Sequence, residues 1–204
     1  MKKATKKPRK PSREIMEWLL TILAAFVIVL PIRAFGFEMV RVDGESMNGT
    51  LANGEITLVT KFEYATNWLS LPWQEAAAAE NAARITTGGD PQRFDIVICR
   101  YPGRGNTYFV KRVVGLPGDV VELRNGYLYI NGDRYDEPYV DDAYRSGPLN
   151  TFGPYRVPSG EYFVLGDHRN DSNDSRLQGS LTRDRIIGHV RCVLFPFAEI
   201  RGLE

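Results

Sequence analysis

The sequence predicts a mostly β protein, in which an antiparallel β-sheet or barrel-like domain follows one N-terminal apolar helix and contains a small helical insert. Three observations predict this fold class. Short apolar or alternating runs recur after residue 36, Asn-Gly pairs punctuate them, and Gly (19) and Pro (12) are frequent. The 204 residues are 43% hydrophobic and 25% charged, which suits one globular domain with a short appendage.

Residues 1–13 form a basic tail that carries seven Lys or Arg side chains and no acidic one. The rest of the chain holds 19 basic and 25 acidic residues, so the net charge of +1 hides an asymmetry. A nucleic-acid-binding arm and a membrane-facing segment both have such a tail. The apolar run that follows favours the membrane, and we expect no nucleic-acid partner.

Residues 14–36 are interpreted as a transmembrane anchor. No charge interrupts the run from Trp18 to Ile32, and Trp18 and Arg33 are suitable residues for its two interfaces. The excess of Lys and Arg before the run places the N-terminus in the cytoplasm and residues 37–204 outside it. Two alternatives stay open, a cleavable signal peptide with the small residues of 34–36 at its cleavage site and a helix buried in a soluble domain.

Short strands are predicted along the body, each bounded by Gly, Pro, Asn or Asp. The Asn125-Gly126 pair predicts a tight β-hairpin. A partly helical insert is expected at about 64–93, with its helix over 76–84, and its role is not revealed by the sequence. Residues 136–160 and 166–180 are interpreted as loops. The predicted strands cover 36–44, 56–62, 95–100, 108–115, both sides of the hairpin turn, 162–165 and 186–195.

The two cysteines, Cys99 and Cys192, each lie in an apolar, strand-like run. Outside the cytoplasm they could pair, and buried free thiols are equally compatible with the pattern. His168 and His189 are isolated in the sequence, and no Cys/His cluster has the spacing of a metal site. We therefore expect no metal and no cofactor.

Lys111 is the candidate general base. A serine nucleophile can lose its proton to a lysine only if the lysine is neutral, which requires lowering a pKa of about 10.4 by roughly three units, or about 4 kcal/mol. Burial among apolar groups has this effect. Strand alternation places Lys111 on one side with Phe109 and Val113, and Arg112 on the other. An ordinary exposed lysine beside an arginine is the alternative on spacing alone.

Ser46 is the candidate nucleophile. It lies within residues 44–51, a tight turn between two predicted strands, where side chains are exposed and backbone N–H groups can converge on an oxyanion. A second polar segment, residues 166–176, is dense in opposite charges and hydroxyls that could hold it by its own ion pairs. An ordinary turn serine and a solvated loop are the alternatives.

Together these segments resemble the bacterial type I signal peptidases, membrane-bound serine proteases with a Ser–Lys dyad. The resemblance starts with the basic tail and apolar run. It continues in chain order through 44–51 (GESMNGTL), 94–99 (FDIVIC), 111–119 (KRVVGLPGD), 166–176 (GDHRNDSNDSR) and Gly179. Position 111 is a lysine, as in the bacterial enzymes that the sequence resembles, whereas the enzymes of the endoplasmic reticulum have histidine at this position.

The resemblance implies that Ser46 attacks the scissile carbonyl and contributes its N–H to the oxyanion hole, while neutral Lys111 is the general base. Ser172 would orient the lysine amine. The same loop would supply the supporting residues Asp167, Arg169, Asp174 and Arg176, the last two as an ion pair. Exported preproteins would bind as an added β-strand and be cut after small residues, as in Ala-x-Ala. Candidate substrate-binding residues are Gly44, Met47, Leu51, Phe109 and Val110.

Three positions depart from the family's usual pattern. Gly49 stands where proline is usual and is expected to loosen the turn. Gly44 provides no hydroxyl for the oxyanion hole, and His168 stands where asparagine is frequent. We expect a monomer in the bacterial cytoplasmic membrane whose partners are preproteins and the lipid bilayer.

The rival interpretations differ in function class. A self-cleaving, repressor-like Ser–Lys protease would be soluble and would carry a DNA-binding helical domain. A non-catalytic, membrane-anchored binding module on the same fold is the second rival. The third is a dedicated peptidase for a narrow set of surface-protein precursors, which the sequence does not separate from a housekeeping enzyme.

Overall fold

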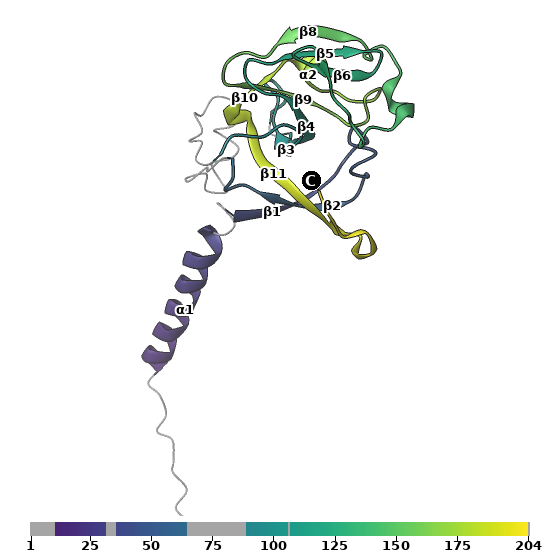
Figure 1. Cartoon of the computed structure of the whole chain (residues 1–204). Coiled ribbons are helices and arrows are strands. Elements are labelled where there is room, and N and C mark those ends of the chain that lie inside the picture. Colours follow the sequence, from purple (N-terminus) through teal and green to yellow (C-terminus); the bar gives the residue numbers. More distant parts are fainter. Residues whose placement is uncertain (1–10, 32–35, 65–88, 106, 204) are drawn as a thin grey trace, which may run out of the picture.

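The computed structural model describes residues 11–31, 36–64, 89–105 and 107–203. The first element is the helix α1 (Pro11–Pro31), which projects from the β domain in Figure 1. Its large apolar side chains are exposed from Ile15 to Val29. Among the described residues, no helix combines the length and hydropathy that a membrane span needs. Residues 32–35 of the expected anchor and the expected helix over 76–84 lie outside the described residues.

The body is mostly antiparallel β-sheet, as predicted. Its larger sheet has the strand order β1-β2-β11-β3-β4-β9-β10, and β12 pairs with β11. These strands are β1 (Phe37–Arg41), β2 (Ile56–Thr60), β3 (Ile96–Cys99), β4 (Phe109–Gly115), β9 (Glu161–Leu165), β10 (Leu181–Thr182), β11 (Ile186–Phe195) and β12 (Arg201–Gly202). β4 lies inside this sheet, where it pairs with β3 through residues 109–112 and with β9 from Arg112 onward.

A second sheet of four strands, in the order β7-β6-β5-β8, covers the end of the larger one (Figure 1). Its strands are β5 (Val120–Arg124), β6 (Tyr127–Ile130), β7 (Asp133–Arg134) and β8 (Phe152–Arg156). The predicted hairpin is confirmed. Asn125 and Gly126 have φ values of 52° and 84°, the left-handed pair that a two-residue turn requires.

Residues 136–160 were interpreted as loop, and this is wrong for two parts of the segment. It contains the 3₁₀ turn η2 (Asp142–Arg145) and the strand β8. The Gly153-Pro154 pair within β8 is typical of turns, but the flanking rings of Phe152 and Tyr155 pack on Phe163, with centroids 5.4 and 5.2 Å away. Burial of these aromatic rings outweighs the local turn signal. The loop predicted over 166–180 likewise contains a short helix, α2 (Ser175–Gln178).

Three apolar clusters form the core. Alternate residues of β3 face opposite sides of the sheet, so Ile96 and Ile98 pack in one cluster and Val97 and Cys99 in another. The third cluster joins Val114 of β4 to the inner side chains of β5, β6 and β9. β4 therefore contacts apolar side chains in all three clusters, which places its middle residues away from water.

Candidate active site

Ser46 lies in the turn of residues 44–51, within the segment 42–55 that joins β1 to β2. Backbone hydrogen bonds close the turn, from Asn48 N to Glu45 O at 2.9 Å and from Leu51 N to Met47 O at 2.8 Å. The Met47 and Leu51 side chains, each 1% exposed, pack in the core beneath it. This leaves the Ser46 side chain half-buried at the rim.

Gly49 has a backbone conformation that proline is unable to adopt. Its φ is +102°, whereas proline is fixed near −65°. A Cβ at this position would lie 3.0 Å from the Tyr139 carbonyl oxygen. Glycine instead of the family's usual proline at position 49 is therefore explained by the positive φ of this residue and by its close approach to the Tyr139 backbone.

Lys111 Nζ lies 2.6 Å from Ser46 Oγ, although 65 residues separate the two positions. The amine also donates to the Val110 carbonyl oxygen at 2.9 Å. The Lys111 side chain is among the largest that the protein buries completely, with 2% of the residue exposed. Lys111 pairs with Val97 of β3, and the Phe109 ring lies near its amine. These two side chains make the surroundings of the amine apolar.

The environment of Lys111 favours its neutral form. Burial lowers the pKa of the amine, because a charged group is less stable away from water. Cys99, Asp174 and Asp167 act in the opposite direction, but desolvation is the larger effect. Burial also raises the pKa of the Cys99 thiol to about 12, so this thiol stays protonated at neutral pH.

Gly166 lies against both the Ser172 hydroxyl and the Ser46 carbonyl oxygen. A Cβ on this glycine would lie 2.2 Å from Ser172 Oγ and 2.4 Å from the Ser46 carbonyl oxygen, so only glycine permits the approach. The expected hydrogen bond from Ser172 to Lys111 is not found. Within the part of the chain that the structure describes, the buried Ser172 hydroxyl has no hydrogen-bond partner.

Asp174 and Arg176 hold the loop that carries Ser172. The Asp174 carboxylate accepts bonds from Arg176 Nη2 at 2.7 Å and Nε at 2.9 Å, and both side chains are fully buried. The same carboxylate caps α2 and accepts a hydrogen bond from Gly166 N at 3.0 Å. This one ion pair therefore fixes both the start of α2 and the glycine beside Ser46.

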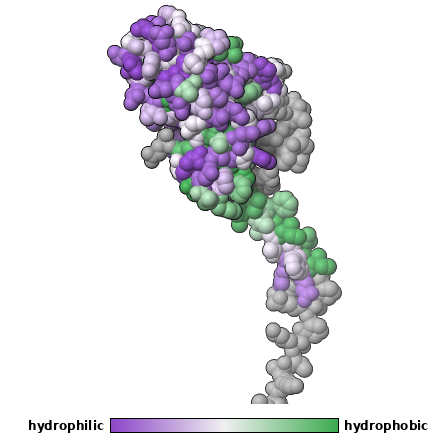
Figure 2. Space-filling model, turned by 90° about the vertical axis from the view of Figure 1, so that its right-hand side faces the viewer, coloured by the Kyte–Doolittle hydropathy of each residue, from purple (hydrophilic) through white to green (hydrophobic). Residues whose placement is uncertain are grey.

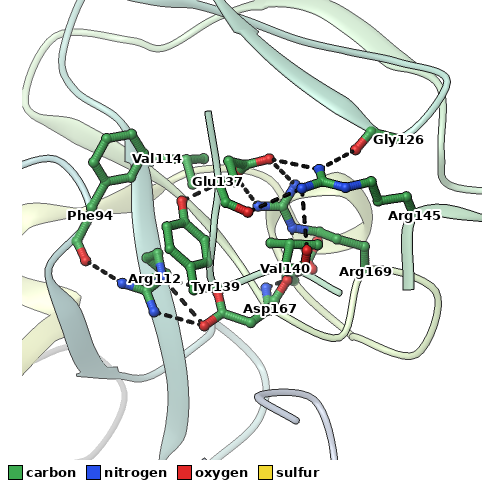
Figure 3. A network of polar contacts seen from close by, with 12 residues as sticks. Phe94, Arg112, Val114, Gly126, Glu137, Tyr139, Val140, Arg145, Asp167 and Arg169 are labelled. Atoms are coloured by element: carbon green, nitrogen blue, oxygen red, sulfur yellow. Dashed lines mark hydrogen bonds and ion pairs between the residues drawn. The ribbon is translucent and has the colours of Figure 1, made fainter. Parts of the chain in front are cut away.

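Asp167 is paired with Arg112, a residue to which the sequence interpretation gave no role. Arg112 Nε and Nη2 approach the Asp167 carboxylate at 3.0 and 2.8 Å, and both residues are buried. Arg112 also donates to the Phe94 carbonyl oxygen at 2.9 Å and lies under the Tyr139 ring (Figure 3). The one feature of the sequence that could have indicated this buried ion pair is the presence of an arginine within an apolar strand.

Arg169 is paired with Glu137, which lies in the segment interpreted as loop. Glu137 is 1% exposed, accepts bonds from Arg169 Nη1 and Nη2, and contacts Arg145 Nη1 at 3.5 Å (Figure 3). Arg145 in turn donates to the carbonyl oxygens of Val140 and Gly126. The second sheet and η2 are thereby joined to the 166–172 loop, a long-range contact that no local pattern indicates.

The expected substrate-binding residues divide into two groups. Phe109 and Val110 are half-buried, and Gly44 is exposed, so all three have surface that a ligand could reach. Met47 and Leu51 are almost completely buried and were misplaced as pocket walls, because their side chains pack under the turn. A cavity of about 460 Å³ lies near this turn, between residues 48–55 and 199–201, but neither Ser46 nor Lys111 lines it.

The two cysteines are free. Cys99 is buried beside Lys111 in the apolar cluster of β3 and β4, while Cys192 on β11 is partly exposed. Of the two arrangements that the sequence left open, the structure has unpaired thiols.

Comparisons with known proteins show the family to which this chain is similar. The model of the family "Signal peptidase, peptidase S26" matches residues 15–195. A signal peptidase I of Bacillus licheniformis is 36% identical, with 97% of this chain and 98% of that protein covered. Signal peptidase I P of Bacillus subtilis subsp. natto is 38% identical over 96% and 97% of the two chains.

A crystal structure of a signal peptidase I from Enterococcus faecalis V583 is 38% identical and matches with a TM-score of 0.43, covering 50% of this chain and 97% of that one. The family model spans most of the chain, and the curated relatives match nearly end to end. The chain belongs to the signal peptidase family, peptidase S26.

Proposed function

We propose that Ser46 and Lys111 are the nucleophile and general base with which this family member removes signal peptides from exported preproteins. One observation carries the assignment, the 2.6 Å contact between Lys111 Nζ and Ser46 Oγ in a site where burial lowers the lysine pKa. The non-catalytic alternative is not favoured, because a binding module has no use for a buried amine with a lowered pKa that contacts a serine hydroxyl.

The proposed reaction proceeds through an acyl-enzyme. Neutral Lys111 accepts the Ser46 hydroxyl proton as Oγ bonds to the scissile carbonyl carbon, and the Ser46 N–H stabilises the resulting oxyanion. The C–N bond then breaks, and Lys111 returns the proton to the leaving amine. A water molecule, deprotonated by the same lysine, attacks the Ser46 ester. The bond from the acyl carbon to Ser46 Oγ then breaks, Lys111 returns the proton to Oγ, and the signal peptide leaves.

The edge of β4 supports binding of the substrate as an added strand. β4 pairs with β3 through residues 109–112 but with β9 only from Arg112 onward. Among the described residues, no strand pairs with residues 109–111 on the side opposite β3. An extended peptide can form backbone hydrogen bonds there and contact Phe109, Val110 and Gly44 on its way to Ser46. A shallow site of this kind would select small side chains.

We further propose that α1 anchors the chain in the bacterial cytoplasmic membrane, with the basic tail in the cytoplasm. Exposed apolar side chains along α1, from Ile15 to Val29, support this, because such a surface is unfavourable in water. Figure 2 shows apolar surface over α1 and over the adjoining part of the β domain. Protease added outside sealed, right-side-out vesicles tests the topology, because it should reach the β domain directly. Cleavage of the β domain only after the membrane is broken would contradict the proposal.

The experiment on the dyad measures cleavage of a preprotein in detergent by the full chain. Ser46→Ala and Lys111→Met are expected to reduce the rate to background. The matched control is Lys61→Met, because Lys61 is the other lysine of residues 37–204 and forms a surface ion pair with Glu38 at 2.6 Å. Equal activity of the wild type and Ser46→Ala would reject the assignment.

A further inference from the structure

Glu45, His168 and Asp171 form a cluster beside the Ser46 turn. One candidate ligand atom from each side chain lies within 4.8 Å of the other two. The two carboxylates are exposed and the imidazole is half-buried. The members come from two segments, 123 positions apart at Glu45 and His168, so the sequence interpretation of His168 as isolated missed the cluster.

The donor set suits a transition metal. An imidazole with two carboxylates carries a charge of −2 when the ring is neutral, which balances a divalent ion. Zinc accepts these ligands, and three protein ligands leave a position open for water, whereas calcium and magnesium prefer oxygen ligands alone. Ligand atoms around a tetrahedral zinc ion lie about 3.4 Å apart, so the exposed carboxylates would move inward by about 1 Å.

The imidazole of His168 is already oriented. Its Nδ1 lies 3.0 Å from the Glu45 carbonyl oxygen. A carbonyl only accepts, so Nδ1 donates and the neutral ring keeps its lone pair on Nε2. Histidine ligands commonly have one nitrogen fixed in this way by a backbone carbonyl. The Tyr144 ring, with its centroid 4.0 Å from that of His168, packs against the imidazole.

His189, the other histidine, lacks these features. Its Nδ1 lies within hydrogen-bond distance of both the Glu63 carboxylate and the Tyr64 hydroxyl, at 3.1 and 3.2 Å. It is also buried in the sheet. The two histidines therefore provide an internal comparison between an oriented, accessible ring and one that is already engaged by its neighbours.

We propose that Glu45, His168 and Asp171 bind one divalent transition-metal ion of the zinc class. His168 Nε2 and one oxygen from each carboxylate are the ligands. The ion would join the Ser46 turn to the 166–172 loop, which at present meet through a hydrogen bond from His168 N to Ser46 O at 3.1 Å. Its binding would stabilise the contact between these two segments.

Zn²⁺ alone is the probe, titrated by calorimetry into the full chain in detergent without substrate. All proteins carry Cys192→Ser, which removes the accessible thiol, while Cys99 is buried. We expect one Zn²⁺ per chain and a rise in melting temperature on saturation. His168→Asn and Glu45→Gln should each weaken binding at least about tenfold and remove the rise, because each loses a direct ligand. The matched control Asp136→Asn changes an exposed carboxylate outside the cluster and should bind as the parent does.

Two outcomes would overturn the site. One is the lack of saturable binding below millimolar Zn²⁺ in the parent. The other is unchanged affinity in His168→Asn, which would place the ion elsewhere. Melting curves without metal verify that each variant is folded, and Asp171→Asn offers a second variant if one is not. Because occupancy is measured without substrate, failure of the metal site leaves the Ser46–Lys111 assignment standing, and the reverse is equally true.

Discussion

Lys111 and Arg112 are adjacent in β4 and both are buried, but of the two only Arg112 contacts a carboxylate directly in the part of the chain that the structure describes. Arg112 Nη2 lies 2.8 Å from Asp167, while the near neighbours of Lys111 Nζ are the Ser46 hydroxyl and a backbone carbonyl. Alternation along the strand sends the two side chains to opposite sides. Arg112 is thus compensated by a carboxylate, whereas Lys111 is desolvated and, among the described residues, has no carboxylate in direct contact. This difference gives the lysine its proposed function as a base.

The rate of cleavage should depend on pH through the protonation of Lys111. Burial lowers the Lys111 pKa, and only the neutral amine accepts the Ser46 proton. The rate should therefore rise with pH through a pKa below the ordinary lysine value of about 10.4 and be lost on the acid side. The profile of kcat/KM for a signal-peptide substrate measures this. A rate that only begins to rise near pH 10 would show that the lysine is unperturbed.

Lys111→Arg should be inactive, because arginine remains protonated and is unable to act as a base. A loss of at least about 100-fold in kcat is expected from removal of a general base. Lys61→Arg is the matched control and should retain wild-type activity, since Lys61 is partly exposed and pairs with Glu38 at the surface. Substantial cleavage by Lys111→Arg would remove the lysine from its proposed role.

Lys111→Met should be inactive but more stable than the wild type. The folded-state pKa is lowered, so between that pKa and about 10.4 the unfolded chain binds a proton that the folded chain does not. In this window stability rises with pH, and at neutral pH the buried amine lowers the free energy of unfolding. Methionine has a similar shape and no charge, so a gain of about 0.5–2 kcal/mol is expected. Urea unfolding at pH 7 and pH 10 tests this, and the gain should be smaller at pH 10.

The sequence predicted those strands and turns whose conformation is determined by residues close to them in the chain. Alternation and turn residues located the hairpin at Asn125-Gly126 and the strand that ends at Phe195. The ion-pair partners of Asp167 and Arg169 were not predictable from such local patterns. Arg112 and Glu137 lie 55 and 32 positions from them, and such pairs depend on how the two sheets fold together. Met47 and Leu51 were misplaced for the same reason, because a local pattern marks a residue as apolar without indicating which surface covers it.

Breaking the Arg112–Asp167 pair should destabilise the fold strongly. Both residues are buried, and Arg112→Met would leave the Asp167 carboxylate without its charged partner, at an expected loss of about 3–5 kcal/mol. The double variant Arg112→Met/Asp167→Leu should recover most of this loss, because no uncompensated charge remains. A double-mutant cycle from urea unfolding measures the coupling. Additive single effects would show that the pair contributes no coupling.

Glu137→Gln should loosen the proposed active site from a distance. The substitution leaves Arg169 and Arg145 without the carboxylate that joins the second sheet to the 166–172 loop. We expect a fall in the free energy of unfolding of about 3 kcal/mol, faster amide exchange in residues 166–172 and a lower kcat with little change in KM. Glu122→Gln is the matched control, since Glu122 pairs with Arg124 at the surface and should alter none of these quantities. Unchanged exchange in the loop of Glu137→Gln would mean that the loop is held without this carboxylate, by the Asp174–Arg176 and Arg112–Asp167 pairs.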